Sequence, residues 1–192
     1  MRFDRLGIHG AFLITIERNI DQRGFFARTF CTKEFEDVGI PAAVVQSSIS
    51  FSTCRGTVRG MHFQWPPSRE SKLVRCLRGS IFDVLLDLRP RSPSYLRHIS
   101  VQLNENNRDA VFIPHGVAHG FQTLLDGTEV LYQMADVYAP ALANGVRWND
   151  PAFSIKWPIA GPVVISDRDA DYPDFDRQRF ESELALRAAG DA

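Results

Sequence analysis

The segment between residues 42 and 137 contains eight short runs of β-forming residues, and turn-forming residues separate each run from the next. Short strands at such spacing are typical of an antiparallel sandwich or barrel. Asp126-Gly127, between the last two runs, is a strong hairpin signal. The sequence therefore predicts an all-β core. The expected strands are 42–50, 57–63, 72–78, 81–88, 96–103, 110–113, 119–125 and 128–137.

Shorter elements are expected on both sides of this core. Residues 11–17 and 24–31 predict two strands, because both runs are rich in β-branched or aromatic residues. Residues 32–39 predict one short helix that begins at an N-cap and ends at a glycine. A last helix after Asp176 is expected to pack on the outside of the β body. We expect one domain over residues 1–192, with an arm at about 1–40, a β core at about 42–138 and a C-terminal loop and helix at about 139–192.

The overall charge excludes two classes of partner. Lys and Arg number 22 against 23 Asp and Glu, and this balance gives no basic field for nucleic acid or an anionic membrane.

No apolar run is long enough to span a bilayer. Cys31, Cys54 and Cys76 are odd in number and show no CxxC spacing, so neither a disulfide framework nor a zinc cluster is indicated. We expect a cytoplasmic protein that binds anions through local arginines.

The stretch from Arg59 to Gln64 has the composition of an active-site strand, because it combines a guanidinium, a glycine, an imidazole and an amide. His62 and Gln64 share a parity and are expected to point to one face. Gly60 permits a bulge that would bring Arg59 to the same side. The alternative interpretation is that His62 is a hydrogen-bonded core residue.

Residues 114–121 contain the spacing PxGxxH, which places His119 near the start of a strand and resembles a cupin motif. Metal-binding cupins add an HxH pair and a glutamate from an earlier hairpin. Here the pair is replaced by His62-Phe63-Gln64, and the next charged residue expected to face inward is Lys72. An ammonium is a poor metal ligand, so we predict a cavity without a metal.

An acidic run at residues 167–171 superficially matches the start of a calcium loop. Its sixth position is Tyr172 instead of Gly, and its twelfth is Gln178 instead of Glu. We therefore predict a solvated turn and no calcium site.

A cavity that holds His62, Lys72, His119 and Tyr132 has the groups needed to remove a proton from the carbon next to a ketone. It offers a base, a cation for the enolate oxygen and a phenol. No cofactor is required for such proton transfer. The alternatives are that Tyr132 is an aromatic core residue and that Lys72 is an edge-strand charge.

The sequence resembles the dTDP-4-dehydrorhamnose 3,5-epimerase family over about residues 5–171. The resemblance implies a cupin-type jelly-roll barrel with short peripheral helices, and a homodimer in which an arm around Arg23 and Phe26 reaches the partner's site. It implies a cytoplasmic isomerase of rhamnose and polysaccharide biosynthesis. The motifs that carry it are Asp21–Phe26, Arg59–Gln64, Lys72–Arg75, Ile113–Phe121, Glu129–Tyr132 and Trp148–Pro151.

The same resemblance implies a role for each site residue. His62 is the base, Asp169 orients it, and Tyr132 is the acid on the opposite face. The substrate is a nucleotide sugar, dTDP-4-dehydro-6-deoxyglucose, which is inverted at C3 and C5 to dTDP-4-dehydrorhamnose. The remaining positions are implied to contact this substrate. They are Lys72 and His119 beside the sugar, Arg23 and Arg59 at the diphosphate, and Phe26, Gln46, Ser48, Tyr138 and Arg168 elsewhere.

Four positions depart from the family pattern, which usually has Glu, Asn, Glu and Lys where this chain has Arg28, Ser48, Ala143 and Arg168. A change from Glu to Arg reverses a charge. We therefore expect the chemistry to be retained and the recognition of the nucleotide to differ from that of the family. The alternatives are an epimerase of one carbon, C3 or C5, on another nucleoside diphosphate sugar, a metal-dependent cupin enzyme, and a non-catalytic sugar-nucleotide binding module.

Overall fold

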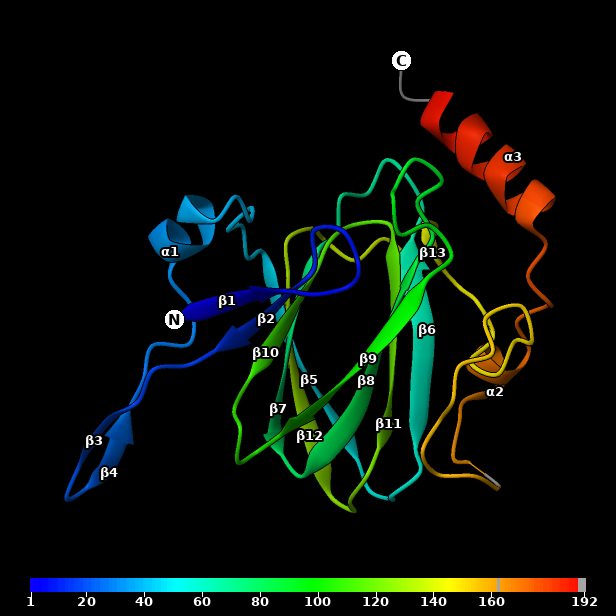
Figure 1. Ribbon diagram of the computed structural model, residues 1–192. Helices are drawn as coiled ribbons and strands as arrows, with labels where there is room; N and C mark the ends of the chain where they lie inside the picture. Colours follow the sequence, from blue (N-terminus) through cyan, green and yellow to red (C-terminus); the bar gives the residue numbers. More distant parts are fainter. Residues whose placement is uncertain (162, 190–192) are drawn as a thin grey trace.

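The computed structural model describes residues 1–161 and 163–189, which form two large antiparallel sheets, a two-stranded hairpin and three short peripheral helices (Figure 1). The helices are α1 (Thr32–Asp37), α2 (Asp167–Ala170) and α3 (Arg177–Ala189). The strands are β1 (Arg2–Arg5), β2 (Phe12–Thr15), β3 (Asn19–Asp21), β4 (Gly24–Phe26), β5 (Gln46–Ser52), β6 (Val58–Gln64), β7 (Lys72–Arg78), β8 (Ser80–Asp87), β9 (His98–Asn104), β10 (Ala110–Ile113), β11 (Val117–Thr123), β12 (Thr128–Met134) and β13 (Ala143–Gly145).

The two large sheets face each other. One has the strand order β1-β2-β10-β7-β12-β5, and the other has the order β13-β6-β11-β8-β9. Consecutive strands alternate between the sheets over much of the core, as in a jelly roll. The prediction of an all-β barrel with peripheral helices is confirmed. Strands β3 and β4 form a separate hairpin that projects from the body (Figure 1).

A cluster of buried apolar side chains fills part of the space between the sheets. Val74 on β7 and Val130 on β12 come from one sheet, and Leu85 on β8 and Phe121 on β11 come from the other. Each of these side chains is completely buried. Alternate residues of these strands therefore point into the barrel, which is the period expected for a sheet with one face on the core.

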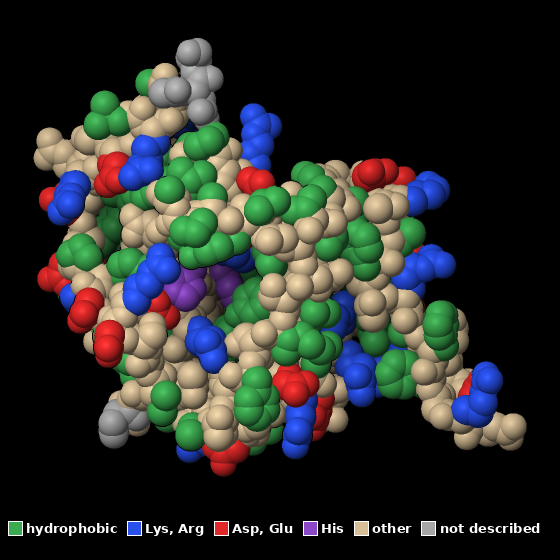
Figure 2. Space-filling view, turned by 180° about the vertical axis from the view of Figure 1, so that it is seen from behind, with side chains coloured by type: hydrophobic (Ala, Val, Ile, Leu, Met, Phe, Trp, Pro, Cys, Tyr) green, Lys and Arg blue, Asp and Glu red, His purple; other side chains and the backbone are tan. Residues whose placement is uncertain are grey.

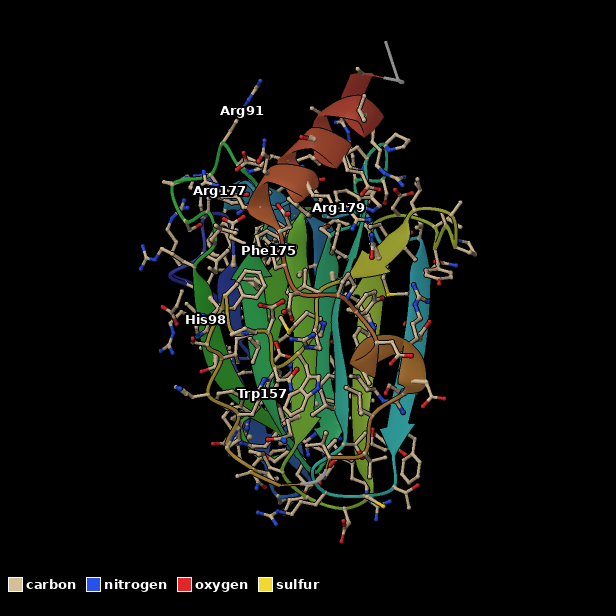
Figure 3. The ribbon with its side chains drawn as sticks, turned by 90° about the vertical axis from the view of Figure 1, so that its right-hand side faces the viewer. Arg91, His98, Trp157, Phe175, Arg177 and Arg179 are labelled. Atoms are coloured by element: carbon tan, nitrogen blue, oxygen red, sulfur yellow. The ribbon has the colours of Figure 1, made fainter. Side chains whose placement is uncertain are left out.

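A second apolar cluster covers the outer face of the five-stranded sheet. Met61 and Phe63 on β6 pack there with Trp65 and with Phe180 on α3. Figure 3 shows the C-terminal chain crossing this face before it enters α3. The expectation that the last helix packs outside the β body is confirmed. Because Met61 and Phe63 point outward, His62 between them points to the barrel interior.

Several predicted boundaries are wrong. The strand expected from Ala42 begins at Gln46, since the exposed Val44 and Val45 lie outside the β5 ladder. The strand expected to reach Cys31 ends at Phe26, where its pairing with β3 stops. The helix after it has Cys31 at its N-cap, without a side-chain capping bond. Strand β11 begins at Val117, two residues before the expected start at His119.

The acidic run at residues 167–171 is also more ordered than the predicted turn, because it contains α2. Ser166 precedes α2, and its hydroxyl accepts a hydrogen bond from the backbone N–H of Asp169. Within residues 1–161 and 163–189, no helix is both long enough and apolar enough to cross a membrane.

Candidate active site

A β-bulge in β6 brings two predicted site residues to the same cavity. His62 lies opposite His119, but Arg59 lies opposite Phe121, so the register shifts between them. Gly60 at the bulge has φ +118°, and an added Cβ would lie 2.6 Å from the Cα atom of Gly120. A side chain at Gly60 would therefore prevent this close approach of the strands. The bulge agrees with the expectation drawn from the sequence.

The cavity lies between the two sheets and has a volume of about 430 Å³. In the space-filling view the histidines lie in a hollow with Lys and Arg side chains nearby (Figure 2). A second cavity of about 270 Å³ shares four of its lining residues and contains Tyr138. The larger of these two cavities is lined by most of the site residues that were predicted from the sequence. They are Ser48, Arg59, His62, Lys72, His119, Tyr132, Arg168 and Asp169.

His62 and Asp169 form a hydrogen-bonded dyad. Nε2 of His62 lies 2.7 Å from Oδ1 of Asp169, and Oδ2 of Asp169 accepts a hydrogen bond of 3.0 Å from the backbone N–H of Gly60. Asp169 is buried, whereas the His62 side chain is 43% exposed. Burial acts to raise the pKa of Asp169, but the hydrogen bonds from His62 and Gly60 outweigh burial and hold this pKa below its ordinary value.

A second imidazole–carboxylate pair lies deeper in the barrel. Nε2 of His119 is 2.7 Å from Oδ1 of Asp83 on β8, and both side chains are buried. Sequence reasoning placed His119 in the cavity but missed Asp83. The available signal was a carboxylate in the middle of the apolar strand 80–87, which needs a buried partner.

Lys72 is also paired with a carboxylate that sequence reasoning missed. Its Nζ atom lies 3.1 Å from Oε2 of Glu70, and the two side chains are 13% and 7% exposed. Both residues line both cavities. Lys72 therefore points into the cavity and is not a solvated edge-strand charge.

Tyr132 on β12 lines the cavity from the sheet opposite His62. Its ring makes an edge contact with the His119 ring, with centroids 5.9 Å apart. Burial, and the nearby charge of Asp83, raise the pKa of Tyr132. The phenol consequently keeps its proton near neutral pH and is available as a hydrogen-bond donor or acid.

Two arginines lie at the edges of the cavity. Arg59 donates hydrogen bonds to the carbonyl of Phe51 at 3.0 Å and to the hydroxyl of Ser52 at 3.2 Å. Arg168 on α2 donates to the carbonyl of Ala143 at 3.2 Å. Hydrogen bonding with Tyr138 raises the pKa of Arg168. Both guanidinium groups are charged and partly exposed, as a site for an anion requires.

Gln46 does not line either cavity. Its side-chain oxygen accepts a hydrogen bond of 2.7 Å from the backbone N–H of Tyr138. Gln46 thus anchors the segment that carries Tyr138.

Arg23 and Phe26 are not brought into the cavity of their own chain. Both belong to the projecting β3–β4 hairpin, where Arg23 pairs with Asp21 and Phe26 is 75% exposed (Figure 1). Arg28 pairs with Glu34 at 2.8 Å near the base of this arm.

In the part of the chain that the structure describes, no three His, Cys, Asp or Glu side chains are placed to hold a metal ion. The groups that converge are instead two imidazoles, an ammonium, a phenol and three carboxylates. Such a set can transfer protons at a carbon next to a carbonyl and can stabilise the oxyanion that forms.

The family model for dTDP-4-dehydrorhamnose 3,5-epimerase matches residues 5–177. This chain belongs to that family. A dTDP-4-dehydrorhamnose 3,5-epimerase from Sinorhizobium fredii is 39% identical over 173 residues, which are 90% of this chain and 89% of that protein. A dTDP-4-dehydrorhamnose 3-epimerase from Streptomyces niveus is also 39% identical, over 89% of this chain and 82% of its own.

Members of the epimerase family also share the three-dimensional structure. The crystal structure of dTDP-6-deoxy-D-glucose-3,5-epimerase from Legionella pneumophila, in complex with dTDP-4-keto-L-rhamnose, has a TM-score of 0.87 and 32% sequence identity. The match covers 95% of this chain and 96% of that one. The cupin-type fold expected from the resemblance is confirmed.

The lowered pKa of Asp169 predicts a pH dependence of stability. Its ordinary pKa is 3.8, and the folded value is lower, so the carboxylate adds stability above about pH 4 that is lost as the pH falls through the folded pKa. Asp169→Asn lacks this contribution. The difference in free energy of unfolding between wild type and Asp169→Asn should therefore shrink from pH 6 to pH 3, measured by urea titration. Asp167→Asn, at an exposed position of the same helix, is the control. A pH-independent difference would contradict the prediction.

Proposed function

We propose that this chain epimerises a nucleoside-diphosphate 4-keto-6-deoxyhexose at C3 and C5. The best substrate is dTDP-4-dehydro-6-deoxyglucose, and the product is dTDP-4-dehydrorhamnose. The observation that carries the proposal is the His62–Asp169 dyad, which lies in the same cavity as Lys72 and Tyr132. The family and its relatives support the same activity.

His62 removes the proton from the carbon next to the C4 ketone. Its Nε2 atom is bound to Asp169, which leaves Nδ1 as the nitrogen that carries the lone pair. The Asp169 carboxylate fixes the ring and stabilises the imidazolium that forms. As the C–H bond breaks, its electron pair forms a carbon–carbon double bond with C4, and negative charge develops on the C4 oxygen. The Lys72 ammonium stabilises this charge.

Tyr132 returns a proton to the opposite face. It lies on β12 of one sheet, whereas His62 lies on β6 of the other, so the two groups can act on opposite faces of a sugar held between them. Proton transfer from the phenol to the carbon inverts its configuration. Exchange with solvent then takes the proton from His62 and returns one to Tyr132, and rotation of the sugar ring between rounds would present C5 and then C3 to the same two groups.

The nucleotide is held at the edges of the cavity, where Arg59 and Arg168 supply charge for the diphosphate. The Legionella pneumophila relative was crystallised with dTDP-4-keto-L-rhamnose. A nucleotide sugar of this type would place its neutral ring among the inner residues. We assign the chain to a reducing cytoplasm, because Cys31, Cys54 and Cys76 are free thiols.

A homodimer completes the site. The arm formed by the β3–β4 hairpin leaves Phe26 75% exposed and Ile20 78% exposed, and Arg23 lies at its turn. Apolar side chains on a projecting hairpin indicate a protein partner. A second copy of the chain would receive this arm, and Arg23 and Phe26 would then reach the partner's nucleotide.

Inversion of C3 alone is the second candidate. The Streptomyces niveus 3-epimerase has the same 39% identity as the 3,5-epimerase from Sinorhizobium fredii. An NMR measurement that resolves both carbons distinguishes the two activities.

The primary test is incubation with dTDP-4-dehydro-6-deoxyglucose in heavy water. NMR should show deuterium entering C3 and C5 and the formation of dTDP-4-dehydrorhamnose. His62→Ala should lower turnover by about 10²- to 10⁴-fold, because it removes the general base. Circular dichroism should show an unchanged fold. Near-normal turnover in this variant would refute the assignment of His62, and no exchange in the wild type would refute the activity.

Tyr132→Phe should separate exchange from inversion. The variant keeps the ring and its contact with His119, and His62 and Lys72 can still form the enolate. The enolate should then be reprotonated by His62 on the original face. NMR should show deuterium at C3 and C5 with at least about tenfold less inverted product relative to exchange. Loss of both processes in equal proportion would show that Tyr132 is needed for proton removal.

Mixed dimers should reveal whether the arm acts in trans. Arg23→Ala and His62→Ala each impair every site of their own homodimer. A mixture allowed to exchange subunits forms hybrids in which one site combines an intact His62 with an intact partner arm. Activity should rise toward about half that of the wild type per hybrid. The double variant Arg23→Ala/His62→Ala, mixed with His62→Ala, is the control and should show no recovery. Absence of recovery in the first mixture would place the arm in cis.

A further inference from the structure

Glu70 lines the cavity, and the mechanism above leaves its carboxylate without a task. It lies on the loop before β7, and its side chain is only 7% exposed. Its Oε2 atom is 3.1 Å from the Lys72 ammonium. Both residues line the cavity that holds His62 and Tyr132. The pair is therefore positioned where the sugar is expected to bind.

A carboxylate next to this ammonium has an electrostatic cost for the reaction. It offsets part of the positive charge that stabilises the enolate oxygen, and the effect is large because both side chains are nearly buried. Glu70 would slow proton removal at either carbon unless it also contacts the substrate. A substrate hydroxyl that donates to Glu70 would remove this conflict.

The proposed substrate has one hydroxyl next to the ketone, and it is on C3. Removal of the C3 proton gives an enediolate, in which the C3 hydroxyl and the C4 oxyanion lie side by side in one plane. A carboxylate and an ammonium held next to each other match this pair, because the carboxylate accepts from the hydroxyl and the ammonium donates to the oxyanion. C5 carries a methyl group and the ring oxygen, so the enolate formed there has no hydroxyl on C5 to offer.

We propose that Glu70 is a specificity-determining residue for the C3 step. Its carboxylate accepts a hydrogen bond from the C3 hydroxyl while Lys72 holds the C4 oxygen. This assignment rests on the proposed function, since it requires a 4-keto sugar in the cavity. Proton removal at C5 uses Lys72 without this contribution from Glu70.

The experiment compares exchange at C3 and C5 of the same substrate molecules in heavy water. A charged hydrogen bond of ordinary strength corresponds to about a 10- to 100-fold effect. Glu70→Leu should therefore lower the ratio of C3 to C5 exchange by about 10- to 100-fold, with the C5 rate equal to or above that of wild type. Glu70→Gln keeps the side-chain length and a neutral acceptor, so the ratio should fall between those of wild type and Glu70→Leu.

Glu129→Leu is the matched control, because Glu129 lies on β12 but outside both cavities. Its C3 to C5 ratio should equal that of wild type. If Glu70→Leu does not fold, the nearly isosteric Glu70→Gln still tests the proposal. An unchanged ratio in a folded Glu70 variant, with both carbons exchanging in wild type, would overturn the role of Glu70 alone. Wild-type exchange at C5 only would also overturn it. No exchange at either carbon would overturn the proposed function and this inference together.

Discussion

The close approach of β6 and β11 at Gly60 and Gly120 is the constraint on which the site depends. It produces the bulge that lets Arg59 and His62 line the same cavity. The Asp169 carboxylate then binds both the backbone N–H of Gly60 and the ring of His62. One buried side chain thus stabilises the irregular strand and orients the His62 imidazole. The backbone distortion and the imidazole are held by the same group, so neither can shift without the other.

The polar cavity is tolerated inside an apolar barrel because its charged groups are paired. A buried charge without a partner is costly, and a pair with good geometry recovers much of that cost. Lys72 with Glu70 is such a pair, and the carboxylate of Asp83 is likewise satisfied by its contact with the His119 imidazole. Their partners come from β8 and from the loop before β7, so the pairs also connect different parts of the barrel. Stability and chemistry are therefore coupled at these residues.

Much of the fold was predictable because it depends on local pattern. Strand parity places His62 inside the barrel, and the run of short strands indicates a β barrel. The pairs across strands were not predictable, since they depend on register. In the pairing of β8 with β11, Leu85 lies opposite His119 and Asp83 lies opposite Phe121. Asp83 and His119 are therefore diagonal neighbours, and this brings their side chains together. Glu70 lies in a loop, where no periodicity tells which way a side chain points.

The distribution of charge explains why this cavity suits a substrate with a neutral ring and an anionic tail. In the inner part of the cavity, His62, Lys72 and His119 each have a carboxylate partner, so a neutral sugar meets paired groups there. Arg59 and Arg168 differ, because the hydrogen bonds that they make within the described residues go to neutral oxygens. Their positive charge is consequently available to an incoming anion. In the proposed reaction a diphosphate at the edge would fix the position of the sugar, and the inner residues would leave the ring free to turn between two rounds of proton transfer.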